Sequence, residues 1–345
     1  MVTRFSFPLQ HPLPELGHNW QGELARRDWD TYSVGVRVKD PLKKEWTAKI
    51  IRERVANHPM FNGKKTAFEF PDVEIVFDEV EKQIHLQLLP IIITGKYTKL
   101  TRTIAQTRHY CFECKGVGRK HGAICSVCKG EKVLTKESVQ ELIAPFFQNA
   151  FTCGEVLFHG AGREDVDVRM LGSGRPFALT LENPAKRRVD MRVLESEINV
   201  ALKDKVQLSN LQIGLPNDVA YTTQKYHTKR YRALVESSEK INMDMLQSFL
   251  NQKMDVLQTT PLRVEKRRAM KERPHWITLE KVTQIDESHI EIELHASAGC
   301  YIKEFISGDQ GRSLPSLSEW LKTPCVCKEL DVLEIVETDF GVRFE

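Results

Sequence analysis

The segment CFECKGVGRKHGAICSVCKG (111–130) divides this chain, because it is rich in Cys, Gly and Lys and offers little material for a core of its own. Cys111 and Cys114 form one C-x2-C pair, and Cys125 and Cys128 form a second pair after ten intervening residues. A Lys-Gly dipeptide follows each pair. Four thiolates in two such knuckles match tetrahedral zinc, and the glycines let the backbone turn toward the sulfurs. We predict a structural Zn²⁺ site without a catalytic role, because four thiolates leave no coordination position open.

The alternatives to zinc are a redox pair and chance spacing. A redox C-x-x-C normally occurs singly near a βαβ unit, so the doubled motif favours metal. The start of the chain, MVTRFSFPLQHPLPELGHNW, is too polar and too rich in proline for a secretory signal. The chain also has no run of about 18 apolar residues, so we expect no contact with a membrane. We expect a cytoplasmic location, or a nuclear one in a eukaryote, where cysteines bind metal more often than they form disulfides.

The cysteine segment separates two regions of ordinary globular composition. The 345 residues are 41% hydrophobic and 28% charged, which allows two or three domains with buried cores. Residues 1–105 combine a helical pattern at 41–59 with strand patterns across 73–97, around a turn at Glu81-Lys82. They predict an α+β domain. Residues 106–134 form the predicted zinc-binding segment, and 135–345 form the last domain.

Residues 135–345 contain more strand patterns than helical ones. A helix is predicted over 135–150, with Thr135 as its N-cap. Its apolar face consists of Val139, Leu142, Ile143, Phe146 and Phe147. Shorter helices are predicted at 242–254 and 316–322. Strands are predicted at 156–160, 177–181, 229–236, 276–284, 288–297 and 329–337. We therefore expect an α+β fold with a mixed, largely antiparallel sheet flanked by helices.

The stretch GREDVDVRMLGSGRPF (162–177) crowds three acidic and three basic residues between glycines. As an extended segment it places Asp165 and Asp167 on one face, and Gly-Ser-Gly at 172–174 reads as a turn between two strands. One interpretation is a salt-bridged hairpin. A second is the metal site of a magnesium-dependent nuclease, built from Glu164, Asp165 and Asp167. A third is a nucleophilic carboxylate that nearby cations keep ionised.

Basic clusters recur at 185–192, 225–232 and 263–273, although the net charge is only +3. A charge run is most often a solvated face. Aromatic residues such as Tyr231 are interleaved with these clusters, and this mixture suits an RNA backbone with unstacked bases. We predict that the three clusters line one groove leading to Asp165, with Arg267 and Arg268 as phosphate contacts.

Five motifs together resemble the Pus-ten-type tRNA pseudouridine synthases of archaea and eukaryotes, and they occur in that family's order. The motifs are GREDVDVRMLGSGRPF, KRYRAL, QTTPLRVEKRR, GCYIKEFISGDQGR and ELDVL. The resemblance covers about residues 70 to 340. Upstream, PDVEIVFDEVEKQIHLQLLPIIITGKYTKLTR resembles the end of the family's THUMP-containing RNA-binding region, so residues 1–105 are expected to be THUMP-like. Cys300 stands where the family usually has threonine.

The resemblance implies a pseudouridine synthase fold and the isomerisation of uridine to pseudouridine at position 54, 55 or both in the T arm of tRNA. It implies no cofactor for catalysis and no obligate protein partner. Asp165 matches the family's nucleophile, Lys303 the basic residue paired with it, and Tyr231 the aromatic residue that stacks on the target base. Further matches in the substrate pocket are Arg163, Ile302 and Leu330. The rival function is a non-catalytic, zinc-containing RNA-binding protein.

Overall fold

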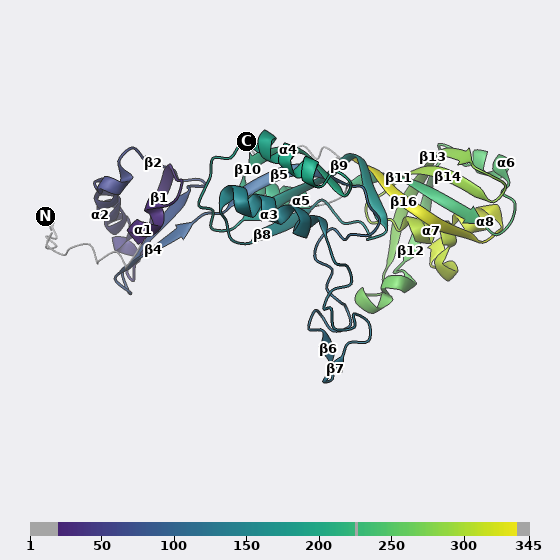
Figure 1. The fold of residues 1–345 in the computed structure, drawn as a ribbon, viewed down its shortest axis with the longest axis horizontal. Helices are drawn as coiled ribbons and strands as arrows, with labels where there is room; N and C mark the ends of the chain where they lie inside the picture. Colours follow the sequence, from purple (N-terminus) through teal and green to yellow (C-terminus); the bar gives the residue numbers. More distant parts are fainter. Residues whose placement is uncertain (1–19, 225–226, 337–345) are drawn as a thin grey trace.

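Residues 20–224 and 227–336 are described by a computed structural model, which contains three sheets (Figure 1). A four-stranded sheet lies at one end of the molecule, and a ten-stranded sheet makes up most of the remainder. A two-stranded hairpin lies in the cysteine segment, which projects from the body of the molecule. The described residues contain no helix that is long and apolar enough to cross a membrane.

The N-terminal sheet has the strand order β2-β1-β3-β4. Its strands are β1 (Thr31–Arg37), β2 (Lys65–Thr66), β3 (Val73–Asp78) and β4 (Gln83–Leu88). Helix α2 (Lys44–Ala56) connects the parallel strands β1 and β3, and the short helix α1 (Trp20–Ala25) precedes them. Trp29, Tyr32 and Phe61 pack edge to face in the core of this part. The predicted helix and the predicted pair of strands around Glu81-Lys82 are confirmed.

Strand β5 (Ile91–Lys99) does not join this N-terminal sheet. It pairs with β10 and β9 of the large sheet, so the two sheets divide the chain between Leu88 and Ile91, upstream of residue 105. Ile91 and Ile93 are buried in the core of the large sheet, and this burial favours the pairing of β5 with that sheet.

The large sheet has the order β10-β5-β9-β16-β11-β14-β13-β12-β15, with β8 paired to β9. Neighbouring strands are antiparallel except for β9 and β16, which run parallel, so the prediction of a mixed, largely antiparallel sheet is confirmed. The remaining strands are β8 (Val156–Gly160), β9 (Val168–Leu181), β10 (Val206–Gly214), β11 (Thr228–Ser237), β12 (Lys253–Thr259), β13 (Glu272–Gln284), β14 (His289–Ala296), β15 (Ser313–Leu314) and β16 (Cys325–Val336).

Helices flank this sheet and share its core. They are α3 (Val139–Phe151), α4 (Met191–Ala201), α5 (Pro216–Thr223), α6 (Met243–Gln247), α7 (Ile302–Ser307) and α8 (Leu317–Leu321). Helix α3 buries Val139, Ile143 and Phe147, as its apolar period predicts. The prediction of Thr135 as its N-cap is wrong, because Ser138 accepts a hydrogen bond from the backbone of Glu141 and returns one to that side chain. The Ser138 hydroxyl thus caps the first turn of α3.

Two other predictions on this domain are wrong. The helix expected over 242–254 starts after Asn242 but ends at Gln247, because residues from Lys253 onward pair with β13. The glycines at 172 and 174 do not form a hairpin turn. They bend a single strand, β9, whose first residues pair with β16 and whose later residues pair with β5. A change of strand partner therefore replaces the predicted turn.

The hairpin of the cysteine segment consists of β6 (Arg119–Lys120) and β7 (Ala123–Ile124). Its core is a separate cluster of four buried cysteines with Leu134 packed against it. The segment follows β5 in the chain and returns to the large sheet through α3. It is thus an insertion between two elements of the sheet, held by little apart from the cysteines.

Candidate functional site

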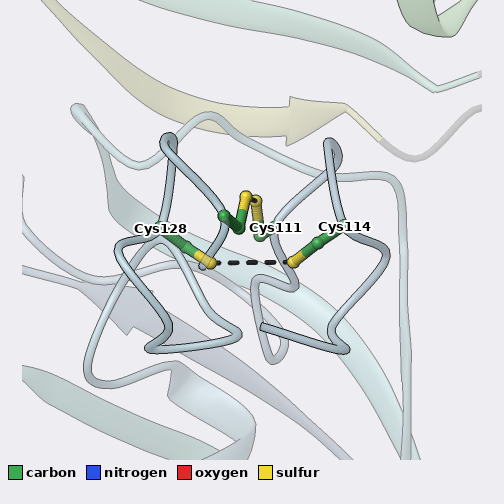
Figure 2. A group of neighbouring side chains, drawn as sticks. Cys111, Cys114 and Cys128 are labelled. Atoms are coloured by element: carbon green, nitrogen blue, oxygen red, sulfur yellow. Dashed lines mark hydrogen bonds between the residues drawn. The ribbon is translucent and has the colours of Figure 1, made fainter. Parts of the chain in front are cut away.

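The four cysteines meet in one tight cluster (Figure 2). Their sulfurs all lie within 4.8 Å of one another. Cys111 Sγ lies 3.8 Å from Cys125 Sγ, and Cys114 Sγ lies 3.6 Å from Cys128 Sγ. Sulfurs at about 2.3 Å from a tetrahedral zinc ion are about 3.8 Å apart, so the donor set fits such an ion. The backbone N–H of Gly118 donates to Cys114 Sγ at 3.2 Å, as an amide does to a thiolate. These four residues can therefore hold a metal ion.

A second site is a cleft of about 320 Å³ in the large domain. It contains most of the residues that the sequence singled out. Those lining it are Arg163, Asp165, Tyr231, Arg268, Ile302, Lys303 and Leu330. They come from places as far apart in the chain as residues 163 and 330, so the fold brings them together. The side chain of Arg267 lies outside the described residues.

Strand order explains this convergence. β9, β16 and β11 are neighbours in the middle of the sheet. Leu330 of β16 lies opposite Val168 of β9 on one side and Ala233 of β11 on the other. Tyr231 lies two residues before Ala233 on the same face of β11, and α7 begins at Ile302 beside these strands. The cleft thus opens where the two halves of the sheet join.

Asp165 lies on a turn that precedes β9. The predicted alternation of faces holds only from Val168, because the backbone N–H of Val168 closes the turn on the carbonyl of Asp165 at 3.2 Å. The side chain of Asp165 is 47% exposed, and it faces the cleft. A carboxylate on a turn at the edge of a cleft is accessible to a ligand, whereas one within the strand would be screened by its neighbours.

Lys99 holds this turn from beneath. Its buried Nζ donates to the backbone carbonyls of Ile104, Asp165 and Val166 at 2.9, 3.0 and 2.9 Å. Burial lowers the pKa of Lys99 to about 8, and the nearby carboxylates act in the opposite direction. The three acceptors use all three protons of the ammonium group. Lys99 therefore fixes the backbone on which Asp165 stands.

The cation that contacts Asp165 is Arg263, not Lys303. Arg263 donates to Asp165 Oδ2 at 2.8 Å and, through Nε, to the buried carboxylate of Glu304 at 2.6 Å. Burial lowers the pKa of Arg263, but the carboxylates of Glu304 and Asp165 outweigh this effect and raise the pKa above its usual value. Arg263 lies on the 3-10 helix Leu262–Arg267, which follows β12. The predicted ionic partner of Asp165 is therefore corrected to this residue.

Lys303 pairs with the other aspartate of the turn. Its Nζ lies 2.6 Å from Asp167 Oδ2. Burial raises the pKa of Asp167, but the hydrogen bond from Lys303 outweighs this effect and keeps the pKa below its usual value. Lys303 still lines the cleft that contains Asp165. The reason for the changed pairing is geometric: the turn at 165–167 directs the two carboxylates toward different cations, which an extended strand would not do.

Glu164 is buried and faces away from these two aspartates. Its Oε2 lies 2.8 Å from Arg175 Nε, and both side chains are at most 1% exposed. The hydroxyl of Tyr97 donates to the same carboxylate at 2.9 Å, and Gln106 donates to that hydroxyl. Among the described residues, Glu164, Asp165 and Asp167 form no group that could share a metal ion. The nuclease interpretation of these three carboxylates is therefore wrong.

A third ion-pair group closes the other side of the turn. Arg169 binds the buried carboxylate of Asp331 in a bidentate manner at 2.9 and 2.7 Å. Arg102 reaches Asp331 and Glu329, and it donates to the carbonyl of Leu330. These contacts tie the start of β9 to β16. The charges of the 162–177 stretch thus serve separate purposes. Glu164 and Arg175 form a buried pair, Arg169 braces β9 against β16 through Asp331, and Asp165 faces the cleft.

Tyr231 closes the apolar side of the cleft. It is 8% exposed, and burial raises its pKa, as does the neighbouring Cys300. Burial also raises the pKa of Cys300, to about 12, so both groups are protonated at neutral pH. Ile302, Leu330 and Val332 complete this wall. An apolar wall with a protonated phenol suits the face of a flat, uncharged ring.

The basic clusters do not all line this cleft. Arg187, in the first cluster, donates to the backbone carbonyl of Asp72, and Arg188 pairs with Asp30 in the N-terminal part. Arg230, in the second cluster, pairs with Glu280 and Glu334 on its own sheet. The cleft takes Lys229 from the second cluster and, from the third, Arg263 and Arg268 among the described side chains. The prediction of one groove lined by all three clusters is therefore wrong. Lys225 and Tyr226 lie outside the described residues.

Sequence reasoning missed the residues that position Asp165. Lys99 and Arg102 lie in a strand and loop before the cysteine segment, more than sixty positions from Asp165 in the chain. No local pattern links them to it. Arg263 belongs to the basic cluster 263–273, which is predicted only to line the RNA groove, and no pairing with Asp165 is predicted for it. The signal that was available is the motif QTTPLRVEKRR, whose first arginine is Arg263.

Most of this chain is similar to known proteins. A family profile described as "Pus10, C-terminal" matches residues 92–336. The tRNA pseudouridine synthase Pus10 of Methanocaldococcus jannaschii is 38% identical over 327 residues, which cover 90% of this chain and 70% of that protein. The protein of the same name from Methanopyrus kandleri is 35% identical, with 93% and 73% covered. That from Archaeoglobus fulgidus is 33% identical, with 91% and 89% covered.

A solved structure also aligns with part of the chain. It is the archaeal box H/ACA sRNP Nop10-Cbf5 complex, with 14% identity and a TM-score of 0.30 over 57% of this chain and 43% of that one. A TM-score this low supports no conclusion. The family profile and the relatives each cover most of the chain. The chain belongs to the Pus10 family of tRNA pseudouridine synthases, which are isomerases.

Proposed function

We propose that this protein converts uridine to pseudouridine at position 54, 55 or both in the T arm of tRNA, with Asp165 as the nucleophile. In this reaction the N1–C1′ bond of the uridine breaks, the uracil turns, and a C5–C1′ bond forms. The proton lost from C5 is balanced by the proton that N1 gains. Atoms and charge balance within the substrate, so the reaction consumes no cofactor.

The accessible carboxylate of Asp165 carries this proposal. It faces a cleft large enough for one nucleotide, and the guanidinium of Arg263 lies 2.8 Å from it. A nucleophilic carboxylate must be ionised, and it must be reachable by the sugar carbon. Among the three acidic residues of the 162–177 stretch, Glu164 is buried against Arg175 and Asp167 is paired with Lys303. Glu164 and Asp165 both border the cleft, but the side chain of Glu164 is fully buried whereas that of Asp165 is 47% exposed, so Asp165 is the accessible carboxylate of the two.

Tyr231 is proposed to stack on the target uracil. Because burial raises its pKa, its hydroxyl carries a proton and can pass one on only by giving up its own. We assign to it the stacking of the ring and a relay of the C5 proton to solvent, not the role of a permanent base. Ile302 and Leu330 pack beside it and exclude water from the reacting bond. Arg163 and Arg268, at the cleft, are the proposed contacts to the extruded nucleotide and its phosphates.

The assignment of the RNA follows from the relatives, whose names specify tRNA. Extruding a stacked base costs a few kcal/mol, which favours a loop whose stacking is already disturbed. The T-arm position comes from the resemblance of the five motifs. We further propose that residues 1–105 act as a THUMP-like RNA-binding domain, that 106–134 bind structural Zn²⁺, and that 135–345 catalyse the reaction. Strand β5 would then belong structurally to the catalytic sheet.

Replacement of Asp165 by asparagine tests the catalytic assignment. Asp165→Asn keeps the size of the side chain and removes the nucleophilic charge, so pseudouridine formation should be abolished while tRNA binding stays near normal. Asp167→Asn is the matched control on the same turn, and its effect should be milder. The measurement is a single-turnover assay that maps pseudouridine on a tRNA transcript. Conversion at the normal rate by Asp165→Asn would favour the non-catalytic RNA-binding function instead.

A further inference from the structure

The cysteine segment presents an unusual surface for an element of its size. Its core consists of the four cysteines and Leu134, so its other apolar residues point outward. Tyr110 is 55% exposed and Phe112 is 45% exposed. Val117, Ile124 and Val127 are exposed as well. Figure 1 shows the segment projecting from the body of the molecule. Exposed apolar residues gathered on a projecting element mark an interaction site more often than chance placement does.

The same segment is rich in cations. The stretch 106–134 holds six Lys or Arg residues and two Glu residues. Arg108 and Lys120 pair with Glu141 and Glu113. Within the described part of the chain, the other four form no ion pair and are exposed, namely Lys115, Arg119, Lys129 and Lys132. Four thiolates around a divalent ion carry a net charge of −2. This offsets only part of the charge of the four unpaired cations, so the surface stays positive.

The two knuckles place their cations in equivalent ways. Lys115 and Lys129 each follow the second cysteine of a pair, and both have a left-handed backbone, with φ of 51° and 50°. A glycine follows each, also with positive φ. The metal-binding turns therefore hold two ammonium groups outward in matching positions. The guanidinium of Arg108 lies over the ring of Tyr110, at 5.4 Å from its centroid.

We propose that this knuckle surface, formed by Tyr110, Phe112, Lys115, Arg119, Lys129 and Lys132, is a second binding surface for the substrate RNA, apart from the cleft. The inference rests on the proposed function for the identity of the RNA. Exposed rings beside unpaired cations are the combination that binds unstacked bases together with phosphates. A polyanion is complementary to this charge, whereas an apolar protein partner would leave four cations without a counter-charge.

Two sets of substitutions test this surface. The first replaces the four unpaired cations by glutamine, namely Lys115→Gln, Arg119→Gln, Lys129→Gln and Lys132→Gln. The dissociation constant for full-length tRNA should rise, and the slope of its logarithm against the logarithm of salt concentration should fall by roughly one for each phosphate that is no longer neutralised. The second set, Tyr110→Leu with Phe112→Leu, keeps apolar bulk and removes the rings. It should weaken binding by about tenfold for each base that stacks there.

The control is Lys281→Gln with Ile285→Ala on the exposed β13–β14 hairpin, where affinity should not change. Every affinity is also measured in the Asp165→Asn background. The test of this surface therefore holds even where the assignment of Asp165 as the nucleophile fails. Single-turnover rates at saturating tRNA should match wild type in both sets. The metal content of each variant reports whether the cysteine segment is still folded. Should the leucine variant lose its metal, the result of the glutamine variant alone decides the test. An unchanged affinity and salt slope in the glutamine set overturns the proposal, and a loss of self-association in that set would assign the surface to a second copy of the chain.

Discussion

Asp165 depends on two cations that act on different parts of it. Lys99 binds its backbone carbonyl from inside the protein, and Arg263 binds its carboxylate from the cleft side. Lys99 is fully buried, whereas the side chain of Arg263 is 39% exposed. An RNA phosphate entering the cleft can compete for Arg263 but cannot reach Lys99. The two cations therefore differ in purpose: Lys99 fixes the backbone of Asp165, and Arg263 contacts its carboxylate.

Replacing Arg263 should slow catalysis. Arg263→Gln removes a charge-assisted hydrogen bond, a kind of interaction worth about 1.5–3 kcal/mol, so the single-turnover rate should fall by roughly ten- to a hundredfold. Arg273→Gln is the matched control, because Arg273 belongs to the same basic cluster and donates to Thr260 and Lys271 instead. Equal rates for the two variants would show that Arg263 has no part in activating Asp165.

Lys99 predicts a distinctive dependence of stability on pH. Burial lowers its pKa to about 8, whereas an unfolded lysine has a pKa of about 10.4. Between these values the unfolded chain binds more protons than the folded one, so the contribution of Lys99 to stability rises with pH and is lost as pH falls through 8. The free energy of unfolding, measured from pH 7.5 to 10.5, should rise more for wild type than for Lys99→Met. Parallel curves for the two proteins would exclude this titration.

Lys99→Met should also reduce activity, since it leaves the carbonyls of Asp165 and Val166 without a donor. The side chain does not line the cleft, so the loss should be seen in kcat with little change in the affinity for tRNA. A loss confined to affinity would mean that the turn keeps its shape without the ammonium group.

At the scale of elements, local patterns identified most of the sheet. The strand patterns at 229–236 and 288–297 predicted β11 and β14 within two residues, and both are half-buried strands in the middle of the sheet. The cysteine spacing likewise predicted four sulfurs in one cluster. Local patterns failed where distant partners decide the structure. The partner of Asp165 is 98 positions away, and the fate of residues 172–174 depends on β16, which lies near the other end of the chain.

The bend in β9 should be intolerant of a side chain. Gly172 has φ of +58°, and a Cβ there would overlap the carbonyl oxygen of Leu333 in β16. Gly172→Ala therefore adds a backbone clash to left-handed strain, and it should destabilise the domain by about 3 kcal/mol or more. Gly311→Ala is the control, because Gly311 has φ of +85° with no atom within 4 Å of the added carbon. It should cost about 1 kcal/mol. Urea unfolding measures both, and equal losses would mean that β9 can move away from β16.

At the scale of the whole molecule, the described residues contain three separate cores. The N-terminal sheet, the large sheet and the cysteine cluster share no buried apolar residues. The contacts between the first two are polar, such as those of Arg187 with the carbonyls of Asp72 and Leu89. A molecule built in this way should lose one part without losing the others. The cysteine segment is the most exposed to such loss, because its core has only five residues.

Removal of the metal should therefore unfold residues 106–134 and leave the large sheet intact. Four thiolates brought together without an ion would repel, and binding free energy is folding free energy in a segment with so small a core. After treatment with a strong chelator, hydrogen exchange should become fast across 106–134, while β9, β11 and β16 remain protected. Cys114→Ser should have the same effect without chelator, and Cys153→Ser, outside the cluster, should have none. If exchange in the segment stays slow after the metal has been shown to leave, the cysteines hold their arrangement unaided and the structural role of the ion is wrong.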